Sequence, residues 1–150
     1  MRIVLLEPEI PPNTGSVARL AAATQTPLDL IGPLGFSLED RYLKRAGLDY
    51  WPWVDLTVYD SWQQYLAAPH RGRLLGLSAR ATRSYTEAAF CETDRLLFGK
   101  ETSGLGADII SMLGEHVFTI PMSSPHVRSL NLANAVSIVV YEARRQLALV

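Results

Sequence analysis

The sequence has very little of the chemistry that would cross-link the chain or anchor it in a membrane. Its 150 residues include one cysteine, Cys91, so no disulfide can form within the chain. No apolar run reaches the roughly 20 residues that a membrane span needs, and the apolar start, residues 1–6, stops at Glu7, too soon for the core of a signal peptide. These absences predict a protein of the reducing cytoplasm with no membrane partner.

The sequence also lacks a metal-binding pattern and an excess of positive charge. The three histidines, His70, His116 and His126, are scattered, and Cys91 has no second ligand at metal-site spacing, so we expect no metal. The 14 lysine and arginine residues are balanced by 15 aspartate and glutamate residues, which excludes a basic tail for nucleic acid. Nucleic acid itself stays possible, because 12 of the 14 cations are arginine, whose planar guanidinium suits phosphate and base recognition.

What the chain does have is an alternation of short apolar runs and helical patterns, with no internal repeat and no linker. Continuous apolar strands interleaved with helices are typical of a parallel sheet covered on both faces. We therefore predict one α/β domain over residues 1–150, a mostly parallel sheet flanked by helices. The expected strands are 2–6, 28–31, 56–59, 74–77, 96–98 and 117–120, and the expected helices are 15–23, 38–46, 62–66, 107–113 and 130–149.

The last predicted helix has a broad apolar stripe. Such a stripe is wide enough to cover the sheet and also to contact a second copy, and two-fold homodimers are the commonest oligomers. We therefore expect a homodimer. The stripe consists of Leu132, Val136, Val139, Val140, Ala143 and Leu147.

Three polar loops follow predicted strands, at residues 7–15, 99–106 and 121–129. Ligands of open parallel sheets bind at the carboxyl ends of the strands, so the three loops should converge on one site. The first loop suggests Asn13 as a helix N-cap and places Arg19 one turn further in, which suits a phosphate; a plain cap and a solvated charge explain the same residues.

The second loop combines glycines with a carboxylate, Glu101. Glycines let a backbone approach a ligand closely, although a tight turn before a helix explains Gly104 and Gly106 equally well. The third glycine and the downstream acid of the dinucleotide fingerprint are missing, so NAD is not expected. The carboxylate of Glu101 either orients Arg19 or the loop, or only caps its own turn.

Taken together, the three loops resemble the three motifs of the SPOUT-class RNA 2′-O-methyltransferases. The matching segments are Asn13-x-Gly15-x-x-x-Arg19, Leu97-Phe98-Gly99-x-Glu101-x-x-Gly104-Leu105, and Ile120-Pro121-Met122 followed by Ser129-Leu130-Asn131-Leu132-Ala133-Asn134-Ala135. Residues 7–15, 45–50 and 135–143 narrow the likeness to the minimal methyltransferases of the tRNA wobble nucleotide, cytidine or uridine 34. Lys100, where that subgroup usually has proline, and Ser103, where arginine is common, depart from the pattern and bear on tRNA affinity or target choice.

The resemblance implies a SPOUT fold with a C-terminal trefoil knot, S-adenosylmethionine as cofactor, an obligate dimer, and the anticodon stem-loop of tRNA, with tRNA(Leu) expected, as partner. The cofactor-binding residues that it implies are Leu77, Gly99, Glu101, Gly104, Ile120, Met122, Ser129 and Leu130. The catalytic residues that it implies are Arg19, Ser129, Asn131 and Tyr141. A guanidinium is a weak base because its pKa exceeds about 12, so we expect Arg19 to hold a phosphate or stabilise the developing alkoxide.

Candidate RNA-binding residues are Arg19, Arg80, Arg83 and Arg128. A basic stretch that also includes Arg71 and Arg73, with Tyr85 close by, suits RNA phosphates and a stacked base, or is a solvated face. Two other functions stay open: a noncatalytic RNA- or nucleotide-binding dimer, and a 2′-O-methyltransferase that acts on another tRNA or rRNA position. We expect no separate RNA-binding domain, so a dimer would have to supply the platform for the substrate.

Overall fold

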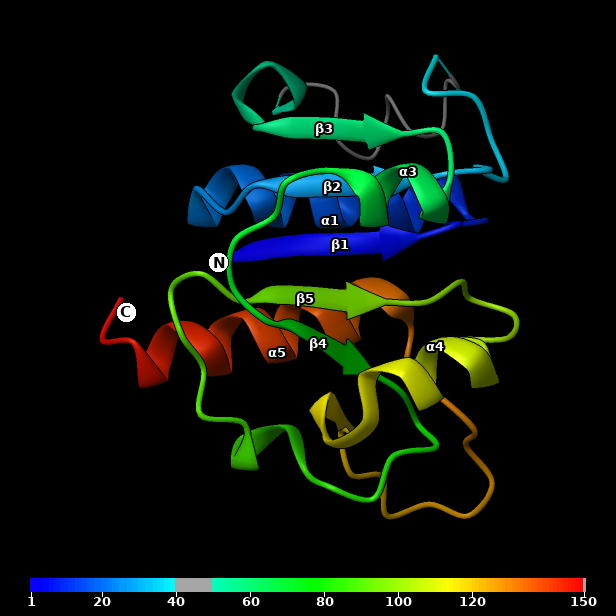
Figure 1. Cartoon of the computed structure of the whole chain (residues 1–150), viewed down its shortest axis with the longest axis vertical. Coiled ribbons are helices and arrows are strands. Elements are labelled where there is room, and N and C mark those ends of the chain that lie inside the picture. Colours follow the sequence, from blue (N-terminus) through cyan, green and yellow to red (C-terminus); the bar gives the residue numbers. More distant parts are fainter. Residues whose placement is uncertain (40–49, 150) are drawn as a thin grey trace.

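The computed structural model describes residues 1–39 and 50–149, and within them the strands form one six-stranded sheet in the order β3-β2-β1-β5-β4-β6. Every neighbouring pair is parallel, so all carboxyl ends lie at one edge (Figure 1). The predicted parallel sheet is confirmed. The strands are β1 (Arg2–Leu6), β2 (Leu28–Ile31), β3 (Leu56–Tyr59), β4 (Leu74–Leu77), β5 (Arg95–Phe98) and β6 (Val117–Phe118).

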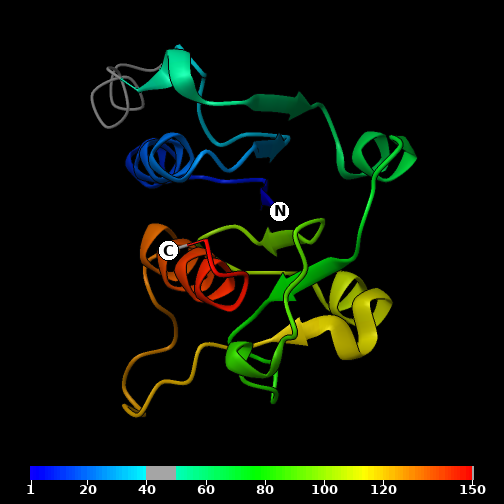
Figure 2. The same cartoon turned by 90° about the vertical axis from the view of Figure 1, so that its left-hand side faces the viewer.

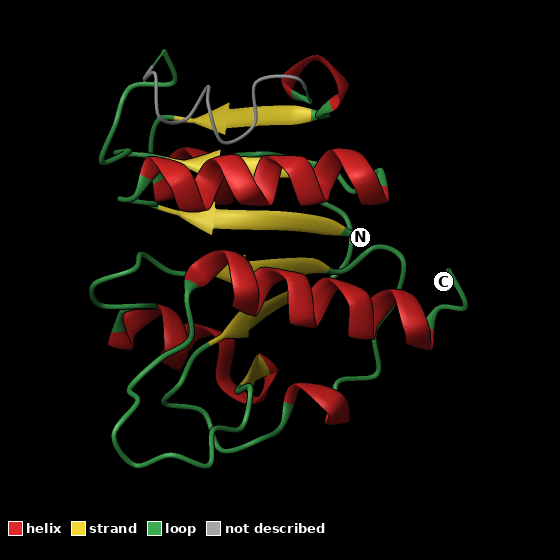
Figure 3. Cartoon of the chain, turned by 180° about the vertical axis from the view of Figure 1, so that it is seen from behind, coloured by secondary structure: helices red, strands yellow, loops and turns green. Residues whose placement is uncertain are grey.

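Successive strand residues point to opposite sides of the sheet, and helices cover both sides, so both faces are buried. Ile3 and Leu5 of β1 belong to the core beneath α1 (Pro11–Thr24) and α5 (Leu132–Gln146), whereas Val4 and Leu6 belong to a second core. That second core is covered by α3 (Trp62–Ala67) and α4 (Ala107–Leu113). Figure 2 shows the three layers edge-on, and Figure 3 shows α1 and α5 side by side on one face.

The ends of several elements differ from the prediction. The last strand is shorter than 117–120, because β6 ends at Phe118 and Thr119 forms only an isolated parallel bridge with Ser84. The last helix spans Leu132–Gln146 rather than 130–149, because the Asn131 side chain caps it by accepting from the N–H groups of the next turn. Short 3-10 helices occupy Trp51–Trp53 (η1), Tyr85–Glu87 (η2) and Gly114–His116 (η3).

Two predictions are not tested by these elements. The helix expected over 38–46 falls mostly on residues 40–49, outside the described residues, and the trefoil knot that the resemblance implies stays a prediction. In the part of the chain that the structure describes, no helix is both long enough and apolar enough to cross a membrane.

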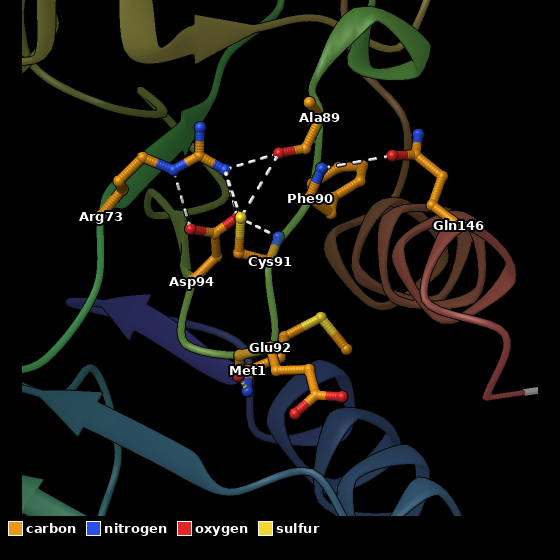
Figure 4. Close-up of polar contacts among 8 residues, drawn as sticks. All are labelled: Met1, Arg73, Ala89, Phe90, Cys91, Glu92, Asp94 and Gln146. Carbon is orange, nitrogen blue, oxygen red and sulfur yellow. Dashed lines mark hydrogen bonds and ion pairs between the residues drawn. The ribbon is translucent and has the colours of Figure 1, made fainter.

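Two buried carboxylates lie at the amino edge of the sheet, each paired with an arginine. Asp29 accepts from Arg2 at 2.7 Å, and Asp94 accepts from Arg73 at 2.7 Å. Asp94 also accepts from the backbone N–H of Cys91 at 2.8 Å, as the close-up of this corner shows (Figure 4). A buried carboxylate is tolerated when such partners satisfy it, so these charges have a structural explanation at this edge.

Candidate functional site

A cavity of about 610 Å³ opens at the carboxyl ends of β4, β5 and β6. Its walls come from the loops at 99–104 and 119–131 and from the start of α1, so the predicted convergence of the three loops on one site is confirmed. All eight predicted cofactor-binding residues line this cavity: Leu77, Gly99, Glu101, Gly104, Ile120, Met122, Ser129 and Leu130. Arg80, Arg128 and Asn131 line it as well.

The loop after β5 folds back on itself at Gly99. A Cβ atom on Gly99 would lie 2.1 Å from the carbonyl carbon of Gly104, closer than any real packing contact. Gly104 itself has φ +66°, and its N–H donates to the carbonyl of Lys100 at 2.8 Å. The missing side chain at Gly99 therefore makes room for the protein's own backbone, and this closed turn gives one wall of the cavity its shape.

Glu101 holds the amino end of α1 rather than its own turn. Its carboxylate accepts from the backbone N–H groups of Glu9 at 2.8 Å and Ile10 at 3.2 Å, and from the Asn13 side-chain amide at 3.0 Å. A negative charge at a helix amino end is favourable because it faces free N–H groups and the positive end of the helix dipole. Of the predicted roles, orienting the first loop is therefore the one that the contacts support.

Glu9, in the first loop, binds the second loop in turn. Its carboxylate accepts from the backbone N–H of Thr102 at 3.0 Å and from the Thr102 hydroxyl at 2.8 Å. These hydrogen bonds hold the pKa of Glu9 below its ordinary value. Loops 7–15 and 99–106 are thus joined by two carboxylates, one from each loop, and each accepts hydrogen bonds from the other loop.

Asn13 is not a helix N-cap, so that prediction is wrong. The helix α1 begins at Pro11, whose fixed φ suits a first turn, and its N-cap residue Ile10 makes no side-chain cap. Asn13 is instead buried in the first turn of the helix, where its side-chain oxygen accepts from the side-chain amide of Asn131 at 2.8 Å. A chain of bonds from Glu101 through Asn13 to Asn131 therefore links all three loops.

Asn131 serves this framework with both ends of its amide. The amide nitrogen donates to the Asn13 side chain. The amide oxygen accepts from the N–H groups of Ala133 at 2.9 Å and Asn134 at 3.3 Å at the start of α5. The side chain therefore positions the loop that carries Ser129 and Leu130, and the catalytic role that the sequence resemblance implied for Asn131 stays a prediction.

Two of the predicted catalytic residues, Arg19 and Tyr141, do not line the cavity of their own chain. Arg19 is exposed on α1, with its guanidinium carbon 4.8 Å from the centroid of the Tyr50 ring. Tyr141 projects from α5 with 51% of its surface exposed. Both helices cover the same face of the sheet (Figure 3), so these two residues belong to one side of the molecule.

The predicted basic stretch does not form one patch. Arg71 and Arg73 precede β4 and Arg80 and Arg83 follow it, so four extended residues, about 13 Å, separate the two pairs. Arg73 is bound to Asp94 at the amino edge (Figure 4). Arg83 donates to the Glu115 carbonyl at 2.7 Å and lies over the Phe118 ring at 4.8 Å. Among the four, only Arg80 lines the cavity.

Sequence reasoning missed the ion pair between Lys100 and Glu7, which join at 2.6 Å beside the cavity. This bond raises the pKa of the Lys100 ammonium. Glu7 has φ +48°, a conformation that costs energy in any residue other than glycine. The available signal was the acidic segment Glu7-Pro8-Glu9, which faces a loop containing the chain's unusual Lys100.

Over residues 1–39 and 50–149 the structure contains no group of three or more histidine, cysteine, aspartate or glutamate side chains arranged to hold a metal ion. The lining of the cavity at the carboxyl edge of the sheet is part apolar and part polar. This arrangement defines an α/β domain that binds a small organic ligand between its loops.

The chain belongs to the SpoU rRNA Methylase family, whose model matches residues 1–141. The family resemblance drawn from the three loops is confirmed, and with it the methyltransferase class. The chain is 48% identical to a putative tRNA (cytidine(34)-2′-O)-methyltransferase of Synechocystis over 98% of this chain and 97% of that protein. It is 46% identical to the tRNA (cytidine(34)-2′-O)-methyltransferase of Escherichia coli K12, over 98% and 94% of the two chains.

Solved structures agree with these relatives. One, described as giving structural insights into the 2-OH methylation of C/U34 on tRNA, has a TM-score of 0.93 and 53% identity, covering 98% of this chain and 95% of that one. The SpoU methyltransferase AviRb of Streptomyces viridochromogenes, in complex with AdoMet, has a TM-score of 0.87 at 25% identity; it covers this whole chain and 61% of AviRb.

Proposed function

We propose that this protein transfers a methyl group from S-adenosylmethionine to the ribose 2′-hydroxyl of the wobble nucleotide, cytidine or uridine 34, of tRNA. The observation that carries the proposal is the cavity in which all eight residues implied by the family resemblance come together. The near full-length likeness to relatives named for this activity supports the same target.

The cavity suits a nucleoside with a polar tail. Its volume lies within the roughly 300–1,000 Å³ of ordinary ligand sites, and Leu77, Ile120 and Leu130 provide apolar walls for a flat base. Thr102 and Ser129 add hydroxyl groups, and the turn between Gly99 and Gly104 presents backbone. When bound, S-adenosylmethionine supplies a methyl group that its own sulfonium already activates.

The protein's task is then to orient the ribose hydroxyl and help it lose its proton. Holding two reactants in line can lower the activation barrier by about 7–11 kcal/mol. Loops that are joined by hydrogen bonds suit this task because they keep the site in one geometry. A guanidinium is a poor proton acceptor, so the base must be a group other than Arg19. We assign Arg19 to holding a phosphate or stabilising the developing alkoxide, with the proton passing to an RNA phosphate or to water.

We also propose a homodimer formed through the face that carries α1 and α5. Large apolar side chains are exposed on or next to α5, namely Leu130, Ile138 and Tyr141. Exposed apolar side chains that lie together on one face are typical of a protein interface. In a two-fold pair, Arg19 and Tyr141 of one protomer would be available to the cavity of its partner. This arrangement would account for their positions outside the cavity of their own chain.

The anticodon stem-loop is the part of tRNA that we expect to bind, with tRNA(Leu) as the first isoacceptor to test. Arg80 and Arg128 line the cavity mouth and would contact its phosphates. Arg83 is a weaker candidate because its guanidinium is already bonded to a carbonyl and lies over a phenyl ring. A tRNA substrate also agrees with the cytoplasmic location predicted from composition.

The decisive experiment incubates the protein with labelled S-adenosylmethionine and unfractionated tRNA and then maps the modified nucleotide. We expect 2′-O-methylation at position 34. Label at another tRNA or rRNA position would overturn the target. Binding of S-adenosylhomocysteine by calorimetry without any transfer would favour the noncatalytic dimer.

The assignment of Arg19 has its own test. We expect Arg19→Lys to lower the single-turnover rate at saturating tRNA by about 100-fold, since a lysine is a point charge that cannot replace two aligned donors. Retention of most of the wild-type rate would show that the guanidinium is not required.

A further inference from the structure

The short helix η1 presents two aromatic rings on one side. The backbone N–H of Trp53 donates to the Tyr50 carbonyl at 2.9 Å, which is the hydrogen bond that defines a 3-10 turn. Side chains three residues apart in such a turn are eclipsed, so Tyr50 and Trp53 share a side. Trp51 takes the other direction and packs against the main core, which fixes the orientation of the turn.

Both rings of this side are open to solvent. Trp53 is 77% exposed and Tyr50 is 40% exposed. Tryptophan carries a large apolar area that favours burial, so a ring left this open is available to a partner. The anchoring of Trp51 means that the exposure is built into the turn by the core rather than left to a loose loop.

A cation lies over one of the two rings. The guanidinium of Arg19, which comes from α1, lies 4.8 Å from the centroid of the Tyr50 ring. We call these three residues the Arg19–Tyr50–Trp53 surface. It combines two exposed aromatic side chains from one turn with a guanidinium from a second element.

That combination fits unpaired nucleotides. Unstacked bases of single-stranded loops stack on tyrosine and tryptophan rings, while guanidinium groups pair with the phosphates between them. A protein partner would need a continuous apolar area, but here the positive guanidinium of Arg19 lies over one of the two rings. The charge complementarity therefore favours RNA.

We infer that the Arg19–Tyr50–Trp53 surface is a stacking platform for unpaired loop bases of the RNA substrate, with Tyr50 also positioning Arg19. The inference rests on the proposed function for the identity of that RNA. It adds a contact at η1 that lies outside the cavity and outside the basic stretch near β4.

The test measures binding of an unmodified tRNA(Leu) anticodon stem-loop to the full chain. Stacking on one aromatic ring is lost in Trp53→Ala, so we expect a Kd about 5- to 150-fold higher. Trp53→Phe should recover part of the affinity and Trp53→Leu should not. Met112→Ala, which removes a 52% exposed side chain from α4 on the opposite face, is the matched control and should bind as wild type.

Two further readouts separate stacking from charge and from folding. The slope of log Kd against log salt should be unchanged in Trp53→Ala and smaller by about 0.7 in Arg19→Ala, because only the second removes a phosphate contact. A blunt duplex of the same stem should bind both Trp53→Ala and wild type equally. Unchanged binding of S-adenosylhomocysteine confirms that each variant is folded.

Wild-type loop affinity in Trp53→Ala would overturn the inference even if position 34 is methylated. Dissociation of the dimer in Trp53→Ala, measured by light scattering, would overturn it too and assign the surface to contact between copies. Trp53-dependent binding of the stem-loop without methylation would support the inference while the proposed function fails.

Discussion

The two edges of the sheet use polar groups in opposite ways. At the amino edge, Asp29 and Asp94 are fully buried, and each is neutralised by one arginine within its own neighbourhood. At the carboxyl edge, Glu9 and Glu101 connect loops that are about 90 residues apart in the sequence and leave a cavity between them. The buried ion pairs at the first edge serve stability, whereas the hydrogen bonds that join the loops at the second edge serve the shape of the site.

The largest effect should come from filling the closed turn at the carboxyl edge. In Gly99→Ala the new methyl group would overlap the Gly104 carbonyl, so the loop must move by about an ångström. We expect the single-turnover rate to fall on the order of 100-fold or more, since such displacements of a site are costly. Gly106→Ala is the control, because a Cβ there meets nothing within 4 Å. Equal activity of both variants would show that the turn does not shape the site.

Removal of a buried carboxylate at the amino edge should affect stability instead of binding. Asp94→Ala leaves the Cys91 N–H without its acceptor and leaves the Arg73 guanidinium with the Ala89 carbonyl but no carboxylate. Because Arg73 is partly solvated, we expect a loss of about 2–3 kcal/mol in the free energy of unfolding, below the full range for buried pairs. Urea unfolding measures this loss, with exposed Glu92→Ala as control. A changed affinity for S-adenosylhomocysteine in the folded variant would show that the amino edge also affects ligand binding, contrary to this prediction.

Neutralising a carboxylate at the carboxyl edge should give the reverse result. Glu101→Gln places an amide where two backbone N–H groups require acceptors, which loosens the start of α1. We expect about a tenfold loss of methyl transfer and a loss of stability near 1 kcal/mol. Glu92→Gln, an exposed change of the same kind, should alter neither. A large loss of stability with normal activity would place Glu101 with the structural carboxylates.

The smallest effect should be a pH dependence near the amino edge. Hydrogen bonds from Arg145 and then Gln146 lower the pKa of Glu142 from 4.5 to about 2. A carboxyl group with a depressed pKa in the folded state adds stability above its unfolded pKa, and that stability is lost as pH falls from about 4.5 towards 2. The Arg145 side chain is 66% exposed, which weakens the pair, so we expect about 0.3–0.5 kcal/mol. Urea unfolding of wild type and Glu142→Gln should differ at pH 7 and converge near pH 2.

The sequence predicted the elements well because burial leaves a direct signal in it. Strands such as 28–31 and 74–77 are recovered with the same ends, since apolar runs stop where the chain leaves the sheet. Helix starts were less accurate. Asn13 carries the residue type of an N-cap, but its tertiary partners Glu101 and Asn131 use the amide for a different purpose.

The sequence also named the residues of the cavity, although not their tasks. All eight residues that the family likeness implied for the cofactor line one cavity, because the three motifs lie in the loops that meet there. The sequence could not show that Asp94 binds Arg73 or that the Glu115 carbonyl binds Arg83, since these partners come from other parts of the chain. It also gave no sign that Lys100 pairs with Glu7.

Local patterns in the sequence therefore determined the parallel α/β domain, the place of the site and the family. Those properties depend on periodicity, on burial and on motif identity, all of which can be read within short windows of the chain. Only the tertiary structure decided which polar groups are used to hold loops together and which stay open to a ligand. Hydrogen bonds such as Glu101 with Asn13 join residues 88 positions apart, so their geometry exists only once the sheet has brought the loops to one edge.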